Sequence, residues 1–253
     1  MSLRTLAVLS LVSLTAIHAH AGEPVAIAGS ITDARQPQAA VSPSGDVYIV
    51  FGSKHTVYCV ASRDGGKNYG APVKVAEVGH LALGMRRGPR IAATKDHLVV
   101  TAIGGEHGGG KDGDVLAWSS ADRGKTWKGP VRVNGVPGAA REGLHHLAAS
   151  PDGLVYCVWN DLRSHGKMPV FGAASKDGGA TWLDEKVVYE APGGKICPCC
   201  QPVAAFDPKG RLLVMWRNSL DGNRDMYLCI SEDGGKTFGS AKKLGLGSWP
   251  TDT

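Results

Sequence analysis

The sequence predicts an all-β fold of repeated four-stranded antiparallel units, on the basis of a repeated turn phrase, its regular spacing and a glycine-rich composition. The phrase combines Ser, Asp, Gly and a closing aromatic residue, and it occurs at Ser62–Tyr69, Ser120–Trp127, Ser175–Trp182 and Ser231–Phe238. Its serines stand 58, 55 and 56 residues apart. A fixed period of about this length is typical of propellers and related repeat folds. The 35 glycines among 253 residues fit a chain with many tight turns.

Each period contains four short apolar runs that are suited to strands. The first two runs are joined by links such as Ser42–Gly45 and Ser150–Gly153, in which Pro presets φ and Gly accepts a positive φ. The repeated phrase joins the third run to the fourth. Four antiparallel strands per period make one propeller blade. The predicted blades span about 36–78, 88–135, 143–191 and 200–246, within a single propeller domain from 22 to 253.

The aspartates of the phrase are predicted to have a structural role. A carboxylate at this place can accept backbone N–H bonds across the turn, and the second glycine can adopt a left-handed conformation. The closing aromatic ring then packs within the blade or against its neighbour. These aspartates are Asp64, Asp122, Asp177 and Asp233.

Residues 1–21 are interpreted as a cleaved signal peptide. Arg4 supplies the positive start, residues 5–17 the apolar stretch, and Ala19-His20-Ala21 a small-x-small cleavage site. The apolar stretch is too short to span a bilayer. The mature protein is therefore expected to be secreted or periplasmic, without a membrane span.

The formal net charge is +5 at pH 7, and the basic residues are spread along the chain without a Lys/Arg run. Proteins that bind nucleic acid usually concentrate their basic residues in a patch or stripe. Nucleic acid is therefore not an expected partner.

The repeated phrase resembles the Asp-box, or BNR, repeat of the sialidase-like β-propellers, and the resemblance covers Gln36 to Leu246. Within that group the chain is similar to exported bacterial proteins of the exo-α-sialidase-like type. The family implies six blades, so the four visible blades are expected to form part of a six-bladed ring that is truncated at the C-terminus. A complete four-bladed ring is the alternative. The group contains glycosidases and binding proteins, so the fold alone does not decide activity.

Propeller topology places the loops between blades and the loops after each second strand on one face, opposite the Asp-box turns. Sialidases hold the substrate carboxylate with three arginines, each able to form paired charge-assisted hydrogen bonds. Arg35-Gln36-Pro37 partly matches the family's Arg-Ile-Pro motif, without the preceding aromatic residue and the Ile. Arg217 and Arg224 resemble the family's Arg-rich segment before an Asp box. Together with Arg163 on the same face, these arginines are the predicted substrate contacts.

The family mechanism uses a Tyr nucleophile activated by a Glu and a separate Asp as acid/base. The Tyr and the third Arg belong to late blades that this chain lacks. Glu142 and Asp161 are the candidate catalytic carboxylates on the predicted functional face. Whether the protein is an enzyme stays open on this evidence.

Three cysteines gather in the loop that enters the fourth blade, and they depart from a plain sialidase pattern. Cys197, Cys199 and Cys200 could bind a soft cation such as Cu(I) or Zn²⁺ as thiolates, with His145 completing the set. The alternatives are a disulfide or a redox pair, since Cys197 and Cys200 have the C-x-x-C spacing. The remaining cysteines, Cys59, Cys157 and Cys229, lie in apolar strands and are expected to be packing thiols. No cofactor is expected apart from this possible metal ion.

The resemblance implies an exported glycoside hydrolase of the exo-α-sialidase type that recognises an acidic glycan in a cationic central pocket. The first alternative is a propeller that binds a glycan or protein without catalysis. The second is a metal or redox protein centred on Cys197–Cys200.

Overall fold

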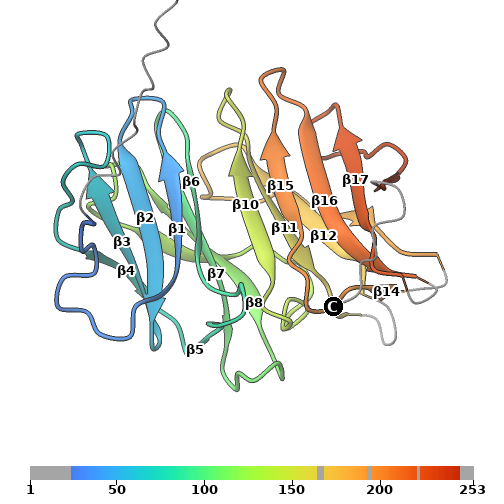
Figure 1. The fold of residues 1–253 in the computed structure, drawn as a ribbon, viewed down its shortest axis with the longest axis horizontal. Coiled ribbons are helices and arrows are strands. Elements are labelled where there is room, and N and C mark those ends of the chain that lie inside the picture. Colours follow the sequence, from blue (N-terminus) through green and yellow to red (C-terminus); the bar gives the residue numbers. More distant parts are fainter. Residues whose placement is uncertain (1–23, 164–167, 193–194, 221–222, 246–253) are drawn as a thin grey trace, which may run out of the picture.

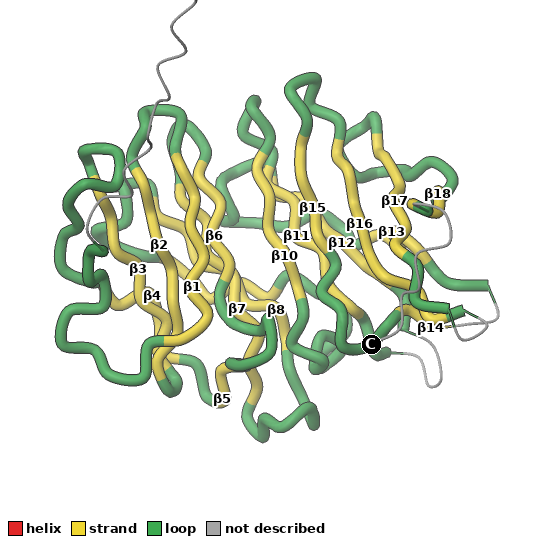
Figure 2. The backbone as a smooth tube through the Cα atoms, in the orientation of Figure 1, coloured by secondary structure: helices red, strands yellow, loops and turns green. Residues whose placement is uncertain are grey.

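The protein is all-β in a computed structural model that describes residues 24–163, 168–192, 195–220 and 223–245. Eighteen strands form four antiparallel sheets, and within the described residues there is no helix (Figure 2). It follows that no membrane-spanning helix occurs in this part of the chain. The predicted signal peptide, residues 1–21, lies outside the described residues.

The sheets follow one another along the chain, one for each predicted repeat. Blade 1 contains β1 (Arg35–Val41), β2 (Val47–Ser53), β3 (Thr56–Ser62) and β4 (Val73–Glu77). Blade 2 contains β5 (His80–Leu81), β6 (Arg90–Ala93), β7 (Leu98–Gly105), β8 (Asp114–Ser120) and β9 (Lys128–Arg132). Blade 3 contains β10 (His145–Ala149), β11 (Val155–Asn160), β12 (Val170–Ser175) and β13 (Lys186–Tyr189). Blade 4 contains β14 (Lys195–Ile196), β15 (Val203–Phe206), β16 (Leu212–Ser219), β17 (Met226–Ser231) and β18 (Lys242–Leu244).

The blades stand side by side with their first long strands adjacent, in the order β1, β6, β10, β15 (Figure 1). These four strands form the inner wall, which faces the viewer in Figure 1. Blade 4 does not pack on blade 1 in the described part of the chain, so the four blades form an open arc. The fold is therefore a β-propeller assembly of four-stranded blades, as the repeat predicts.

The hydrophobic core consists of three clusters, and each cluster lies between two neighbouring blades. The middle blades therefore bury both faces of their second strands: along β11, Trp159 packs towards blade 2 and Tyr156 towards blade 4. In blade 4, by contrast, buried and half-buried residues alternate along β16. Burial on both faces explains why β7 and β11 read as continuous apolar runs in the sequence.

The four Asp-box turns repeat one hydrogen-bond pattern. In the first, Ser62 Oγ donates to Asp64 Oδ1 at 2.7 Å, and the backbone N–H groups of Lys67 and Asn68 donate to the same oxygen at 3.1 and 2.9 Å. Gly66 donates its N–H to Ser62 Oγ at 2.8 Å and has a φ of 93°, which favours glycine. The hydrogen bonds from Asn68 hold the pKa of the Asp64 carboxyl at about 2. The same turn recurs around Asp122, Asp177 and Asp233.

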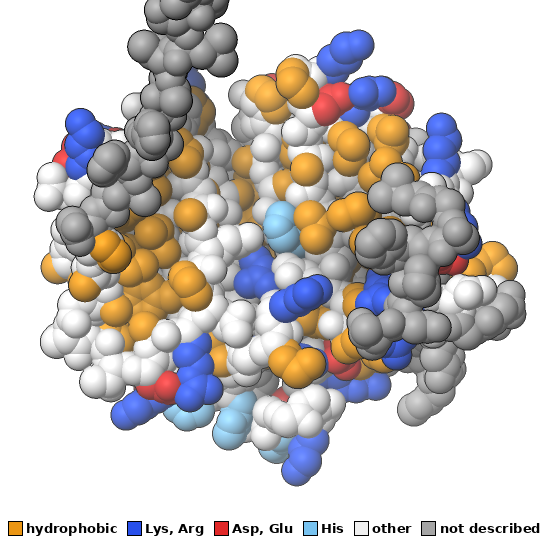
Figure 3. All heavy atoms as spheres, viewed as in Figure 1, with side chains coloured by type: hydrophobic (Ala, Val, Ile, Leu, Met, Phe, Trp, Pro, Cys, Tyr) orange, Lys and Arg blue, Asp and Glu red, His pale blue; other side chains and the backbone are white. Residues whose placement is uncertain are grey.

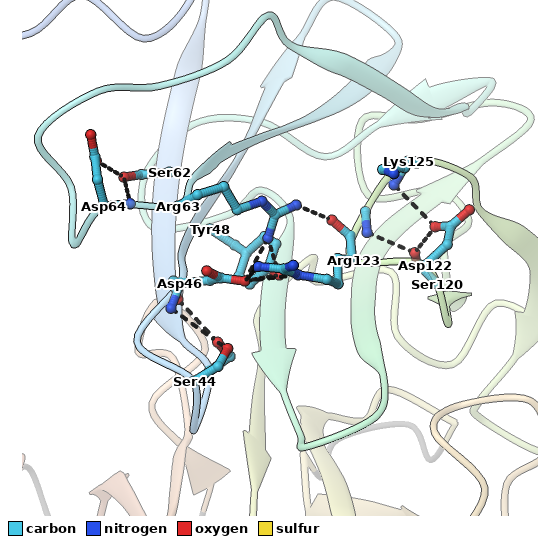
Figure 4. A network of polar contacts seen from close by, with 12 residues as sticks. Ser44, Asp46, Tyr48, Ser62, Arg63, Asp64, Ser120, Asp122, Arg123 and Lys125 are labelled. Carbon is cyan, nitrogen blue, oxygen red and sulfur yellow. Dashed lines mark hydrogen bonds and ion pairs between the residues drawn. The ribbon is translucent and has the colours of Figure 1, made fainter.

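The Asp-box rim also joins blades through ion pairs, which Figure 4 shows between blades 1 and 2. The buried carboxylate of Asp46 accepts from Arg123 of the second Asp box and from Arg63 Nη1 at 2.7 Å. Tyr48 donates its hydroxyl to the same carboxylate at 3.1 Å. These hydrogen bonds, that of Arg123 first, lower the pKa of Asp46. The rim therefore serves to hold adjacent blades in register.

The inner strands of blades 2 and 4 are each split into two pieces. In blade 2, β5 and β6 pair with opposite ends of β7, and residues 82–89 form the loop between them. In blade 4, β14 and β15 pair with β16 in the same way, around residues 197–202. The strands β5 and β14 are not predictable from the sequence, because two-residue strands have no periodic pattern. Both loops project to the face opposite the Asp boxes.

Candidate functional site

The face opposite the Asp boxes, here called the channel face, carries the splitting loops of blades 2 and 4 and the entries to the inner strands. Basic side chains and histidines gather along the lower edge of the molecule in Figure 3, next to the place of β5 in Figure 1. The spacing of the repeats predicts that these side chains lie on one face. They differ in exposure and in how many hydrogen bonds or ion pairs they already form.

Arg90, the first residue of β6, is a buried arginine without a carboxylate partner in the described structure. Its guanidinium donates to four backbone carbonyls: Pro89 at 2.9 Å, Gly88 at 3.1 Å, His145 at 3.2 Å, and Arg86. Burial lowers the pKa of Arg90 to about 10, so it keeps its charge at neutral pH. Arg90 therefore closes the 82–89 loop from inside and ties it to blade 3.

His145 and His146 begin β10, between blades 2 and 4. His145 is fully buried, and its Nε2 lies 3.0 Å from Thr101 Oγ1. His146 Nδ1 accepts from the backbone N–H of Ala204 at 3.3 Å. Burial, and then the nearby charge of Arg90, lower the pKa of both histidines, to about 4 for His146. Both rings are therefore neutral at pH 7 and bind blade 3 to its neighbours.

Asp161 was predicted as a catalytic carboxylate and Arg163 as a substrate contact, but the structure pairs them with each other. Asp161 is inaccessible to solvent and accepts from Trp159 Nε1 at 2.9 Å and from Arg163 Nε and Nη2, both at 2.8 Å. Arg163 also pairs with Glu185 at 2.6 Å and stacks on Phe171. Hydrogen bonds to Asp161 raise the pKa of Arg163. These contacts give both residues a structural role and leave neither carboxylate oxygen of Asp161 for a substrate.

Glu142, the other predicted catalytic carboxylate, lies on the channel face in a half-buried ion pair. Its Oε1 accepts from Arg87 Nη2 at 2.7 Å, and its backbone carbonyl accepts from Arg87 Nε at 2.7 Å. The side chain is 23% exposed. Glu142 is thus reachable, although its negative charge is compensated.

The predicted anion-binding arginines differ in availability. Arg35 is exposed, and its ion-pair partner among the described residues is nearby Asp33, at 2.6 Å. Arg217 donates its Nε to the carbonyl of Arg224 at 3.0 Å, which fixes the guanidinium near the cysteine loop. Arg224 and Arg86 are exposed, and neither has an ion-pair partner in the described structure. The residues best placed to receive an anion are therefore Arg35, Arg86 and Arg224.

The structure brings the three loop cysteines together. Cys197 Sγ lies 3.3 Å from Cys199 Sγ and 3.1 Å from Cys200 Sγ, and all three sulfurs lie within 4.8 Å of one another. The structure records no disulfide at these residues. His145, the predicted fourth ligand, is not part of this group among the described residues. Cys59, Cys157 and Cys229 are buried in strands, and burial raises the pKa of all three thiols, to about 12 for Cys59 and Cys229.

Sequence reasoning missed two residues that hold the cysteine loop. Asn160 Nδ2 donates to the carbonyl of Cys200 at 3.0 Å, and Gln201 Nε2 donates to the carbonyl of His145 at 2.7 Å. One signal was present: Gln201-Pro202 stands at the same place in its repeat as Gly88-Pro89 and Gln36-Pro37. An alignment of the repeats on their first hairpin places the three X-Pro pairs in register.

Residues 88–249, more than half of the chain, match the family model of the BNR repeat-like domain. The chain belongs to the BNR repeat-like domain family. No curated protein matches it in sequence. The family and the blade geometry together establish a sialidase-like BNR propeller.

Several solved structures resemble the chain in fold. A protein of unknown function from Dyadobacter fermentans has 19% identity and a TM-score of 0.58, over 84% of this chain and 69% of that one. An α-L-arabinanase from Penicillium chrysogenum, complexed with arabinobiose, has 17% identity and a TM-score of 0.56, over 85% and 68%. A leech intramolecular trans-sialidase has 13% identity and a TM-score of 0.61, over 88% of this chain and 53% of that one. At these identities the likeness extends to the fold alone.

Proposed function

We propose that this protein is an exported BNR propeller whose channel face binds an acidic glycan. The observation that carries the proposal is the presence of exposed guanidinium groups, at Arg86 and Arg224, that have no ion-pair partner in the described structure. A planar guanidinium can hold a carboxylate through two parallel hydrogen bonds. The export part of the proposal rests on the signal-like sequence of residues 1–21.

Arg35 supports the proposal as a third contact. Its ion pair with Asp33 is exposed, with 58% and 41% of the two side chains accessible. Exposed pairs of this kind contribute little stability, so exchanging Asp33 for a ligand carboxylate costs little. Arg87, Arg90 and Arg163 are occupied by the partners described above and are not included in the proposed contact set.

The test is binding of sialyllactose, with lactose as the neutral control, measured by calorimetry. We expect sialyllactose to bind and lactose not to bind, and Arg86→Ala to weaken binding by about tenfold or more, as for a lost charge-assisted hydrogen bond. Lys236→Ala, an exposed change on the Asp-box rim, is the matched control and should leave affinity unchanged. Equal binding of the two sugars, or an unchanged affinity in Arg86→Ala, would contradict the proposal.

Hydrolysis is the second candidate, and the accessible carboxylate of Glu142 on the channel face favours it. A glycosidase of this fold needs such a group close to the bound sugar. We expect release of fluorescent product from a sialoside conjugate, lost in Glu142→Gln and in Arg217→Ala. Binding of the sialoside without release of product would exclude hydrolysis and support the glycan-binding function.

A further inference from the structure

Cys197, Cys199 and Cys200 form a compact group of three sulfurs in one short turn of the channel face. The N–H of Cys200 donates to the carbonyl of Cys197 at 3.1 Å and closes the turn. This closure brings the first and last thiols to 3.1 Å, with the Cys199 sulfur 3.3 Å from that of Cys197. Three convergent sulfurs are more than a disulfide requires, because a disulfide joins two.

The surrounding blades hold the turn from outside. The N–H of Cys197 donates to the carbonyl of Arg217 at 2.8 Å, on β16. Asn160, at the end of β11 in the neighbouring blade, donates to the carbonyl of Cys200 at 3.0 Å. The side chain of Gln201, the residue after Cys200, donates to the carbonyl of His145 on β10. Hydrogen bonds of this kind position a binding group before its ligand arrives.

The exposure of the sulfurs suits an ion that enters from solvent. Arg217 Nη1 donates to Cys200 Sγ at 3.9 Å. Cys197 is buried, Cys200 is half-buried and Cys199 is exposed, so the group has a protected base and an open side for entry. The strand cysteines lack this arrangement, since each is enclosed by apolar neighbours without a second sulfur in its group.

We propose that Cys197, Cys199 and Cys200 bind one soft, thiophilic metal ion through their three sulfurs, with Cu(I) favoured over Zn²⁺. Thiolate ligands select soft ions such as Cu(I) and Zn²⁺. Zn²⁺ in proteins is almost always four-coordinate, and among the described residues no fourth His, Cys, Asp or Glu ligand atom joins the group. Cu(I) accepts three thiolates without a fourth donor. The site is independent of the glycan proposal and does not require it.

The test is a titration of the full chain, purified under reducing conditions, with Cu(I) in competition with a chromophoric Cu(I) chelator, and separately with Zn²⁺. We expect one equivalent of Cu(I) to bind, with sulfur-only coordination in X-ray absorption. Cys199→Ser should weaken Cu(I) binding by about 100-fold or more without loss of folding, because Cys199 is exposed. Cys229→Ala, a strand thiol, is the matched control and should bind Cu(I) as the parent protein does.

Asn160→Ala tests positioning, because Asn160 touches the loop backbone and not the ion. It should weaken Cu(I) binding by about tenfold and keep the same absorption signature, as outer partners of metal ligands do. Failure of the reduced protein to compete for Cu(I) would overturn the proposal. So would equal affinities of Cys199→Ser and Cys229→Ala, or binding of Zn²⁺ without measurable Cu(I) binding.

Discussion

The loops that split the inner strands of blades 2 and 4 occupy the same place in their sheets but are held in different ways. In blade 2, the buried guanidinium of Arg90 binds the loop carbonyls. In blade 4, Val203 stands at the position of Arg90, and the loop is held by Asn160 of blade 3 and by its own Gln201, which donates to blade 3. The thiols of the blade 4 loop are therefore not needed to anchor it and are available for a ligand. The same interruption of the inner strand thus has a structural role in blade 2 and forms a candidate binding site in blade 4.

The largest effect is expected from removing the internal anchor of the blade 2 loop. Arg90→Met should lower the free energy of unfolding by about 3 kcal/mol, because several buried carbonyls lose their donor and each unsatisfied group costs about 1–3 kcal/mol. Val203→Met at the equivalent place in blade 4 is the matched control and should cost less than about 1 kcal/mol. Urea unfolding at constant m-value measures both. Equal losses of stability in the two variants would show that Arg90 stabilises its loop no more than Val203 does.

A smaller effect is expected from the pH dependence of stability at His146, where blade 3 contacts blade 4. The native pKa of His146 is about 4, below its unfolded value of about 6.5, because burial and then the charge of Arg90 disfavour its protonated form. The neutral ring thus contributes stability above pH 6.5, and this contribution is lost as the pH falls towards 4.

His146→Asn keeps an acceptor for Ala204 and removes the titration. The variant should lose about 1–2 kcal/mol less stability than the parent between pH 7 and 4.5, measured by urea midpoints, since partial exposure of the ring reduces the full effect. An unchanged pH dependence of the free energy of unfolding in His146→Asn would contradict this prediction.

The smallest effect concerns the outer clamp of the blade 2 loop. Counted from the inner strand, Arg87 stands where Cys200 stands in blade 4, and it pairs with Glu142. A double-mutant cycle with Arg87→Met and Glu142→Gln should give a coupling of about 0.5–1 kcal/mol, because both side chains are partly exposed. A larger coupling energy would mean that the Arg87–Glu142 ion pair, as well as Arg90, contributes substantially to holding the 82–89 loop.

The repeat register and the blade architecture could be predicted from the sequence, because the Asp-box turn depends on local hydrogen bonds among neighbouring residues such as Ser62, Asp64 and Gly66. The spacing of the repeats also predicts that polar residues gather on one face. It does not predict the role of each side chain on that face. Asp161, a predicted catalytic carboxylate, accepts hydrogen bonds from Trp159 and Arg163. Arg163 in turn pairs with Glu185, which lies on a different segment. Contacts between blades depend on packing that no local pattern encodes.

The carbonyl oxygen of His145 accepts one hydrogen bond from Arg90 in blade 2 and another from Gln201 in blade 4. Repeat proteins usually unfold as a chain of nearest-neighbour units, in which each repeat depends only on those beside it. Here blades that are not neighbours share an acceptor on the blade between them. A local opening at the start of β10 would release donors on both sides at once, so blades 2, 3 and 4 are linked into one cooperative unit. Blade 1 has no hydrogen bond to this atom among the described residues and is joined to blade 2 by the Asp46–Arg123 ion pair and by a shared core cluster.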